Sequence, residues 1–174
     1  IGHVGQMGGE YPLSPSQRES ISCFQEIEDG EVLAVNGPPG TGKTTLIAAI
    51  VAALKSLGIK TILLAPTGRA AKVLSQYTSE KALTIHKKIY REQTNAQYES
   101  KFSLNLNREA DALFIVDEAS MLSTGSSSDK TLFGSGSLLE DLIQYVRSGK
   151  RCRLMLVGDS AQLPPVGDDF SPAL

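Results

Sequence analysis

Four short apolar runs recur along the chain, and none of them alternates with polar residues. They are Val32–Val35, Thr61–Ala65, Leu113–Val116 and Leu154–Val157. Continuous apolarity over four or five residues is typical of strands that are buried on both faces, as in a parallel sheet covered by helices. The pattern therefore predicts four buried strands of one parallel sheet.

Helices are predicted between these strands. Thr44–Leu57 is apolar most of the way round and stops before Gly58, a residue that readily ends a helix. Shorter helices are expected over Gly68–Gln76, Ile85–Arg91 and Leu138–Arg147. Alternation of strands and helices predicts an α/β fold, with a doubly wound parallel sheet flanked by helices on both faces.

Three segments show neither a clear strand pattern nor a clear helix pattern of apolar residues. Residues 1–12 are Gly-rich and are expected to form a flexible lead-in, after which Ser14–Pro15 has the pattern of a helix start. Residues 92–110 are polar with weak alternation, which leaves a short hairpin or a loop open. Residues 123–137 are Gly/Ser-rich and are expected to form a mobile loop.

The stretch from Gly37 to Thr44 lies between the first predicted strand and the first long helix. It matches G-x-x-x-x-G-K-[ST] at every fixed position. Glycines let backbone N–H groups surround phosphate oxygens, and the helix start adds its positive dipole end. We therefore expect a P-loop in which Lys43 reaches the β- and γ-phosphates and Thr44 holds Mg²⁺, rather than a turn that binds nothing. The expected nucleotide contacts here are Gly37, Pro38, Pro39, Gly40, Thr41, Gly42, Lys43, Thr44 and Thr45.

Polar side chains follow the third and fourth predicted strands. Asp117 and Glu118 come directly after one strand and Gln162 soon after the other, and ligands of open α/β sheets bind at the carboxyl ends of strands. Asp117 is suited to hold Mg²⁺, Glu118 to act as general base, and Gln162 to bond the γ-phosphate or the attacking water. We expect these three residues and Lys43 to act in catalysis, with an acidic turn and an ordinary Pro-bearing loop as the alternatives.

Basic residues are concentrated after the second predicted strand. Between Pro66 and Arg91 there are six Lys or Arg and one acid, Glu80. Such an excess can neutralise a phosphate backbone, to which Thr67 and Thr84 could add positioning contacts. A solvated helical face is an equally good interpretation of the same charges.

Composition narrows the class of protein without identifying it. The net charge of the 174 residues is -2, so any nucleic-acid signal must be local. Only two His and two Cys are present, with no zinc-site spacing, and Cys23 and Cys152 are expected to be reduced. The sequence has no run long enough to span a membrane and no signal-peptide pattern, which favours a cytoplasmic protein without a membrane partner.

Taken together, the motifs resemble those of superfamily 1 DNA helicases, above all the RecD-like and Dda-like group that moves 5′ to 3′. The phosphate loop resembles motif I, Ala65–Ala71 motif Ia, Asp117–Ser120 motif II and Gly158–Val166 motif III. The similarity covers most of the chain, starting at Ser14. A Walker loop alone is shared by many ATPases, whereas its combination with the last two motifs is highly specific.

The resemblance implies a RecA-like P-loop domain over residues 13–174 of a helicase that uses ATP and Mg²⁺ to translocate on single-stranded DNA and unwind duplexes, like the exodeoxyribonuclease V alpha subunit. It implies a core strand between the phosphate-loop strand and the Asp117 strand, for which Leu154–Val157 is the natural candidate. Gln17 resembles the adenine-reading glutamine of the family. Without the resemblance, His86 would be a packing residue. The residues that the resemblance assigns to the nucleic-acid track are Pro66, Thr67, Arg69, Thr84 and His86.

The chain starts at Ile1 rather than Met and stops shortly after motif III, so we expect part of a longer protein. The family has a second RecA-like domain that supplies arginines to the reaction; that domain is absent from this sequence, and no such arginine can be assigned. We expect this piece alone to bind nucleotide weakly and to hydrolyse it very slowly.

The expected partners are single-stranded DNA or RNA, the second RecA-like domain of the full-length chain, and subunits of a repair or recombination complex. Two other classes of function stay open at this point. One is a P-loop ATPase or small-molecule kinase of another kind, and the other is a switch that binds ATP and DNA without unwinding.

Overall fold

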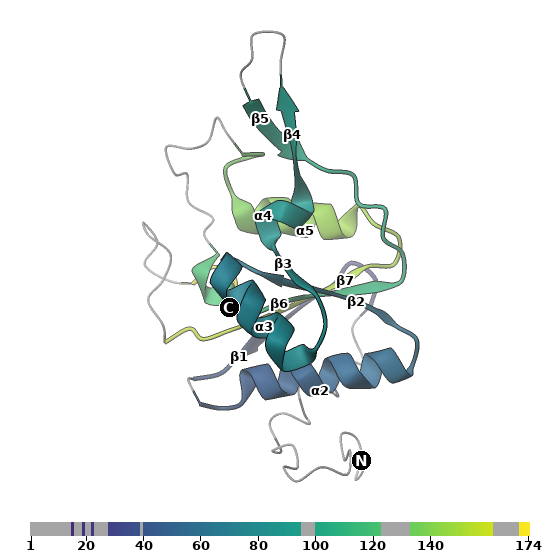
Figure 1. Ribbon diagram of the computed structural model, residues 1–174, viewed down its shortest axis with the longest axis vertical. Coiled ribbons are helices and arrows are strands. Elements are labelled where there is room, and N and C mark those ends of the chain that lie inside the picture. The colour runs from purple at the N-terminus through teal and green to yellow at the C-terminus, as the bar shows by residue number, and fades with distance from the viewer. Residues whose placement is uncertain are drawn as a thin grey trace.

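The computed structural model describes residues 15, 19, 22, 28–38, 40–94, 100–122, 133–161 and 171–174. In this part of the chain, five parallel strands form the main sheet in the order β1-β7-β6-β2-β3, and β4 and β5 form an antiparallel hairpin (Figure 1). The predicted parallel α/β fold is confirmed. The strands are β1 Val32–Asn36, β2 Lys60–Ala65, β3 Ala82–Thr84, β4 Tyr90–Thr94, β5 Ser100–Leu104, β6 Ala112–Val116 and β7 Arg153–Gly158.

Helices cover both faces of the main sheet, with α2 on one side and α5 on the other (Figure 1). The four helices predicted between the strands form, although the third is shorter than expected because the chain enters β4 at Tyr90. None of the helices in the described residues has the length and apolar character needed to cross a bilayer. The helices are α2 Lys43–Ser56, α3 Gly68–Thr78, α4 Ile85–Ile89 and α5 Leu138–Arg147, with a 3-10 turn η1 at Ala119–Met121.

The predicted N-terminal helix is described at three positions only. Pro15, Glu19 and Ser22 are helical, in agreement with a helix that starts at Ser14. Strand β3 was not predicted, because three residues are too few for a periodic pattern. It pairs with β2 in parallel and forms one edge of the sheet.

Strand β7 pairs with β1 on one side and with β6 on the other. Asn36 lies opposite Gly158, and Val116 lies opposite Leu156. The motif III strand therefore stands between the phosphate-loop strand and the Asp117 strand, as the resemblance implied. Because all three strands are parallel, their carboxyl ends meet at one edge of the sheet.

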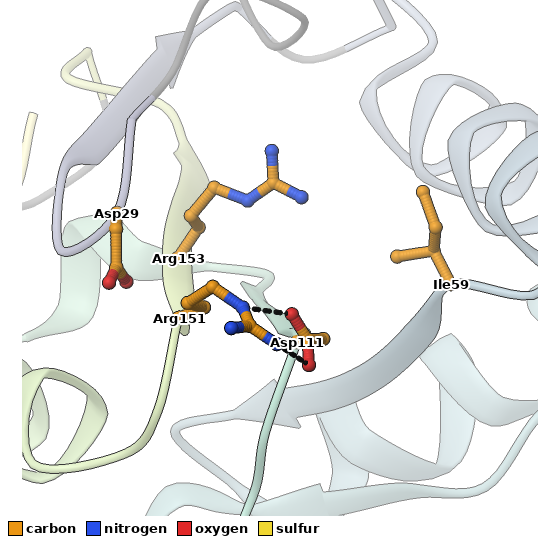
Figure 2. A pocket seen from close by; sticks show the side chains of 5 residues that line it. All are labelled: Asp29, Ile59, Asp111, Arg151 and Arg153. Carbon is orange, nitrogen blue, oxygen red and sulfur yellow. Dashed lines mark hydrogen bonds and ion pairs between the residues drawn. The ribbon is translucent and has the colours of Figure 1, made fainter.

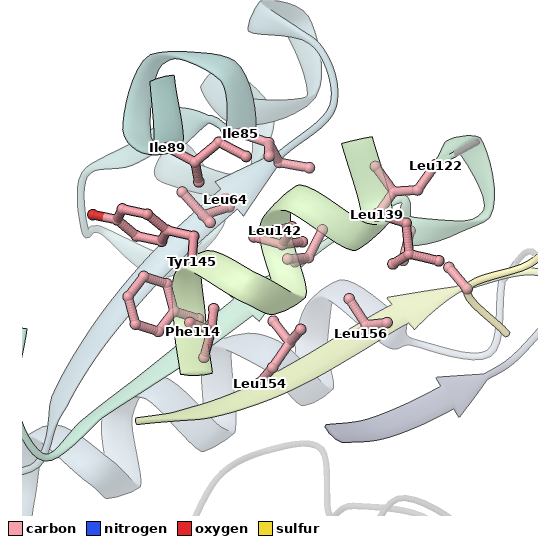
Figure 3. Close-up of a cluster of buried hydrophobic side chains, with 14 of the residues drawn as sticks. Leu64, Ile85, Ile89, Phe114, Leu122, Leu139, Leu142, Tyr145, Leu154 and Leu156 are labelled. Carbon is pink, nitrogen blue, oxygen red and sulfur yellow. The ribbon is translucent and has the colours of Figure 1, made fainter. Parts of the chain in front are cut away.

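Alternate side chains of the central strands enter two separate cores. Phe114, Leu154 and Leu156 pack against α4 and α5 (Figure 3), whereas Ile115 and Met155 pack against α2 and α3. Burial on both faces is thus confirmed for β6, in which every residue is buried.

The prediction of two buried faces is wrong for β1. Leu33 and Val35 pack against the core of α2, but Val32, Ala34 and Asn36 are exposed. The reason is positional: β1 is an edge strand of the described sheet, and the described core beneath α5 includes side chains from β2, β6 and β7 but none from β1.

Residues 92–110, which the sequence left as a hairpin or a loop, contain most of the β4–β5 hairpin. The described end of the predicted loop 123–137 packs against this hairpin. Phe133 stacks on Phe102 with ring centroids 4.5 Å apart, and the Tyr90 hydroxyl donates a 2.6 Å hydrogen bond to buried Asp141. Asp141 also accepts the Ser135 N–H at 3.0 Å. In the described end of this predicted loop, Phe133 and Ser135 therefore contact the hairpin and α5, respectively.

We predict that Tyr90→Phe lowers the free energy of unfolding by about 1–3 kcal/mol, because it leaves a buried acceptor on Asp141 without its hydroxyl donor. Urea denaturation followed by circular dichroism measures the change. The control is Tyr77→Phe, at a side chain that is 64% exposed, which should stay within about 0.5 kcal/mol of the parent. Equal stability of the two variants would contradict the prediction.

Candidate functional site

The phosphate loop connects β1 to α2 at the carboxyl edge of the sheet. The Gly37 N–H donates to the Gly158 carbonyl at 3.0 Å, and the Thr41 hydroxyl donates to the Pro38 carbonyl at 2.7 Å. Gly42 has a φ of 78°, in the left-handed region that glycine adopts without strain. Helix α2 has neither a side-chain cap nor an acidic residue in its first turn, so its positive end favours an anion.

The ammonium group of Lys43 lies on the loop itself. It donates to the carbonyl of Gly37 and, at 3.2 Å, to the carbonyl of Pro38. Thr44 is half-buried and Thr45 is exposed at the start of α2. The structure thus brings the loop, the lysine and the helix start to one point.

Asp117 and Glu118 follow β6 at the same edge. Asp117 is only 7% exposed, and its Oδ1 accepts the Glu118 N–H at 3.0 Å. Burial raises the pKa of Asp117, and the charge of Glu118 adds to this rise, whereas the hydrogen bond from the Glu118 N–H and the charge of Lys43 act to lower the pKa. A cation beside Asp117 would offset the cost of its buried charge.

Glu118 has two unusual properties. Its φ of 56° is a left-handed conformation that a residue with a Cβ rarely adopts, and its Oε2 is buried without a hydrogen-bond partner. Strain and an open acceptor occurring together are typical of functional residues. They suit the predicted role of a base that receives a proton from water.

A cavity of about 370 Å³ opens at this edge of the sheet. It unites two predicted sets: Thr44, Asp117 and Glu118 of the nucleotide set, and Thr67 and Arg69 of the nucleic-acid set. The described residues contain no cluster of three or more His, Cys, Asp or Glu. A Mg²⁺ ion here would therefore take most of its ligands from phosphate and water, as Mg²⁺ commonly does.

The two threonines of the nucleic-acid set are N-caps. The Thr67 hydroxyl accepts the Ala70 N–H at 3.2 Å and so starts α3, directly after half-buried Pro66. The Thr84 hydroxyl accepts the Lys87 N–H at 3.3 Å and so starts α4. Each hydroxyl thus fixes the start of a helix beside the carboxyl end of a strand.

His86 does not line this cavity among the residues that the structure describes. It is half-buried, its ring meets Phe133 edge-on at 5.3 Å, and burial lowers its pKa. The packing role that the sequence alone favoured for His86 is thus present, and its predicted contact with nucleic acid stays a prediction. Gln17, Pro39 and Gln162 lie outside the described residues.

Sequence reasoning missed a contact between the phosphate-loop strand and the motif III turn. Asn36 Nδ2 donates to Ser160 Oγ at 2.6 Å, and the Ser160 N–H returns a bond to Asn36 Oδ1 at 2.9 Å. The signal was available: Asn36, like Asp117, is a polar residue at the carboxyl end of an apolar strand.

Gly158 is the point where the three motifs touch. A Cβ at this position would lie 2.8 Å from the backbone nitrogen of Ser120 and 2.6 Å from Leu174 Cδ1. Its carbonyl also accepts the Gly37 N–H. The motif II turn can approach β7 this closely only because the residue has no side chain.

A second cavity, of about 300 Å³, lies at the opposite edge, where the strands begin (Figure 2). Arg151 forms two hydrogen bonds with Asp111, of 2.5 and 2.7 Å, and Arg153 and Asp29 complete the charged lining. Because both signs of charge are balanced, this cavity has no clear preference for an anion, and it is remote from the carboxyl edge.

Comparison with known proteins agrees with this geometry. A family model described as an AAA domain matches residues 12–169. The chain is 32% identical over 148 residues to the ATP-dependent RecD2 DNA helicase of Deinococcus radiodurans, a match that covers 85% of this chain and 18% of that protein. It is 36% identical over 163 residues to the ATP-dependent DNA helicase dda of Enterobacteria phage T4, covering 88% of this chain and 33% of that protein.

A shorter match, 40% identical over 58 residues, is to the DNA-binding protein SMUBP-2 of Rattus norvegicus and covers 33% of this chain and 6% of that protein. The chain thus spans between about a fifth and a third of the length of the two helicases that it matches over most of its residues.

We predict that Asp117→Asn raises the melting temperature of the nucleotide-free protein at pH 7. The pKa of Asp117 is raised in the fold by burial, so its contribution to stability is full below the unfolded pKa and is lost as the pH rises through the folded pKa. The amide removes that loss and keeps the acceptor for Glu118 N–H. The gain should shrink as the pH falls to 4, close to the unfolded pKa of about 3.9, because less of the Asp117 carboxyl then carries a charge.

Thermal unfolding at pH 4 and pH 7 measures this difference. Asp111→Asn is the control, because Arg151 lowers the pKa of this exposed carboxyl, and the variant should gain nothing at pH 7. A melting temperature of Asp117→Asn that does not exceed that of the parent at pH 7 would contradict the prediction.

Proposed function

We propose that this chain, which belongs to the AAA domain family and is a RecD- and Dda-like motor domain of superfamily 1, binds ATP with Mg²⁺ and couples ATP hydrolysis to movement along single-stranded DNA and to duplex unwinding. The observation that carries the proposal is the cavity that Thr44, Asp117 and Glu118 share with Thr67 and Arg69. One cavity then contains residues suited to cleave a phosphate bond and residues suited to hold a phosphate backbone.

The phosphate loop supplies the binding part of this function. Backbone N–H groups of Gly40 to Thr44 and the positive end of α2 would surround the phosphates, with the Lys43 ammonium on the β- and γ-phosphates. Thr44 and Asp117 would hold Mg²⁺, which neutralises charge on the transferred phosphate. The buried carboxylate of Asp117, with its raised pKa, fits a cation at this place.

Glu118 supplies the base. Its open Oε2 would accept a proton from the water that attacks the γ-phosphorus, while the bond between that phosphorus and the ADP oxygen breaks. An intact acidic pair with an unpartnered oxygen supports turnover rather than a switch that only binds ATP and DNA. No observation favours a kinase.

The turn between β2 and α3 supplies the link to DNA. Arg69 is exposed on the first turn of α3 and lines the same cavity as Glu118. A change in the contents of the cavity would therefore displace the start of α3 and the DNA phosphate bound there. A second RecA-like domain that closes over ATP, and repair or recombination partners, belong to this proposal as well.

We predict that Glu118→Gln lowers the DNA-stimulated ATPase rate of the intact protein by about 10²–10⁴-fold with little change in ATP binding, because only the base is lost. Lys43→Ala should lose both binding and turnover. Glu140→Gln, a change of the same kind on α5, should leave the rate unaltered. If single-stranded DNA does not stimulate the parent protein, the motor function is wrong, and stronger stimulation by RNA would make RNA the track.

We predict that Arg69→Ala weakens binding of single-stranded DNA and reduces the dependence of log affinity on log salt by about 0.7, the contribution of one phosphate contact. Fluorescence anisotropy at several salt concentrations measures this slope. Arg151→Ala removes the same charge from the opposite edge of the sheet (Figure 2) and should leave the slope unchanged. Equal slopes for the two variants would place the DNA elsewhere.

A further inference from the structure

Asp159, directly after β7, is a buried acid with one open oxygen. The residue is 1% exposed. Its Oδ1 accepts the Ala161 N–H at 2.9 Å, whereas its Oδ2 is buried and has no hydrogen-bond partner. Leaving such an acceptor unpaired is costly, and native proteins retain it mainly where function uses it.

Asp141 is a buried acid with a structural role, and its hydrogen bonds can be compared with those of Asp159. It is 3% exposed, and its carboxylate accepts the Tyr90 hydroxyl at 2.6 Å and the Ser135 N–H at 3.0 Å. The two aspartates are equally deep, but only Asp159 keeps an oxygen without a donor. A purely structural role of Asp159 therefore does not explain why its Oδ2 lacks a hydrogen-bond donor.

Strand alternation locates Asp159 relative to Asp117. Ile115 of β6 and Met155 and Val157 of β7 face the core beneath α2, and alternate residues of a strand share a face. Asp117 and Asp159 continue these two rows on adjacent strands. Both acids thus lie at the carboxyl edge, on the face from which α2 begins.

Two side-chain donors at this edge, those of Lys43 and Asn36, bond to other acceptors. The Lys43 ammonium donates to the carbonyls of Gly37 and Pro38, and Asn36 Nδ2 donates to Ser160. Asp159 follows β7 at the same edge of the sheet as the proposed Mg²⁺ site, where the ion would retain several water molecules because the described residues offer few direct ligands. Carboxylates that accept hydrogen bonds from metal-bound groups orient those groups and strengthen metal binding.

We propose that Asp159 is a further residue of the nucleotide site, and that its Oδ2 accepts a hydrogen bond from a water molecule bound to the Mg²⁺ that accompanies the triphosphate. The inference rests on the proposed ATP site. It assigns to Asp159 the orientation of the hydrated cation, a role additional to the base Glu118 and to Thr44 and Asp117, which would hold the ion.

The test compares nucleotide affinity with and without Mg²⁺ in the intact protein. A fluorescent ATP analogue is titrated in excess Mg²⁺ and again in EDTA, for the parent, Asp159→Asn and Asp159→Ser. Both variants keep an oxygen that can accept the Ala161 N–H but lack the second carboxylate oxygen. Asp141→Asn is the matched control at a buried acid whose carboxylate has its donors.

We expect both Asp159 variants to lose at least about tenfold of the affinity that Mg²⁺ adds, the effect of one hydrogen bond to a charged group. Their affinity in EDTA should match that of the parent. The melting temperature of nucleotide-free Asp159→Asn should not fall, because no satisfied bond is removed. Asp141→Asn should show the reverse, with a lower melting temperature and an unchanged effect of Mg²⁺.

Two failures are distinguishable. If the parent protein binds the analogue no better with Mg²⁺ than in EDTA, the proposed ATP site fails and the role of Asp159 fails with it. If the parent shows the Mg²⁺ effect and both Asp159 variants retain it in full, the site stands and the role of Asp159 alone is overturned.

Discussion

The site depends on the pairing of β7 with two strands at once. Hydrogen bonds to β1 on one side and to β6 on the other bring the phosphate loop, the acidic pair and the motif III turn to a single edge. Gly158 makes the approach close, since a methyl group there would collide with the backbone of the motif II turn. Local preferences form the individual strands and helices, but this long-range pairing forms the site.

Much of the fold was predictable because its signals are local. The apolar runs predicted the four longest strands of the main sheet, and Gly, Lys and Thr at fixed spacing predicted the phosphate loop. The acids after β6 and the position of β7 also agree with what the motifs implied. These features depend on neighbours in sequence, or on a resemblance carried by such neighbours, and therefore need no knowledge of distant contacts.

The remaining features depend on contacts between distant residues. Val32 on β1 is exposed because the described core beneath α5 does not extend to β1. No local sequence pattern indicates this limit. Phe133 follows a Gly/Ser-rich segment, so its neighbours in sequence do not predict that it stacks on Phe102. The open oxygen of Asp159 is a property of its environment, and composition cannot distinguish it from the satisfied carboxylate of Asp141.

The pairing of β1 also has a consequence for how the protein is made. Within the described sheet, β1 has β7 as its only neighbour, and β7 is the last of these strands in the sequence. During synthesis, the phosphate-loop strand leaves the ribosome long before its partner, while β2, β3 and α3 can already assemble. The nucleotide pocket is thus completed late, and a nascent chain that stops before β7 has the phosphate-loop sequence but lacks the strand that joins β1 to the rest of the sheet.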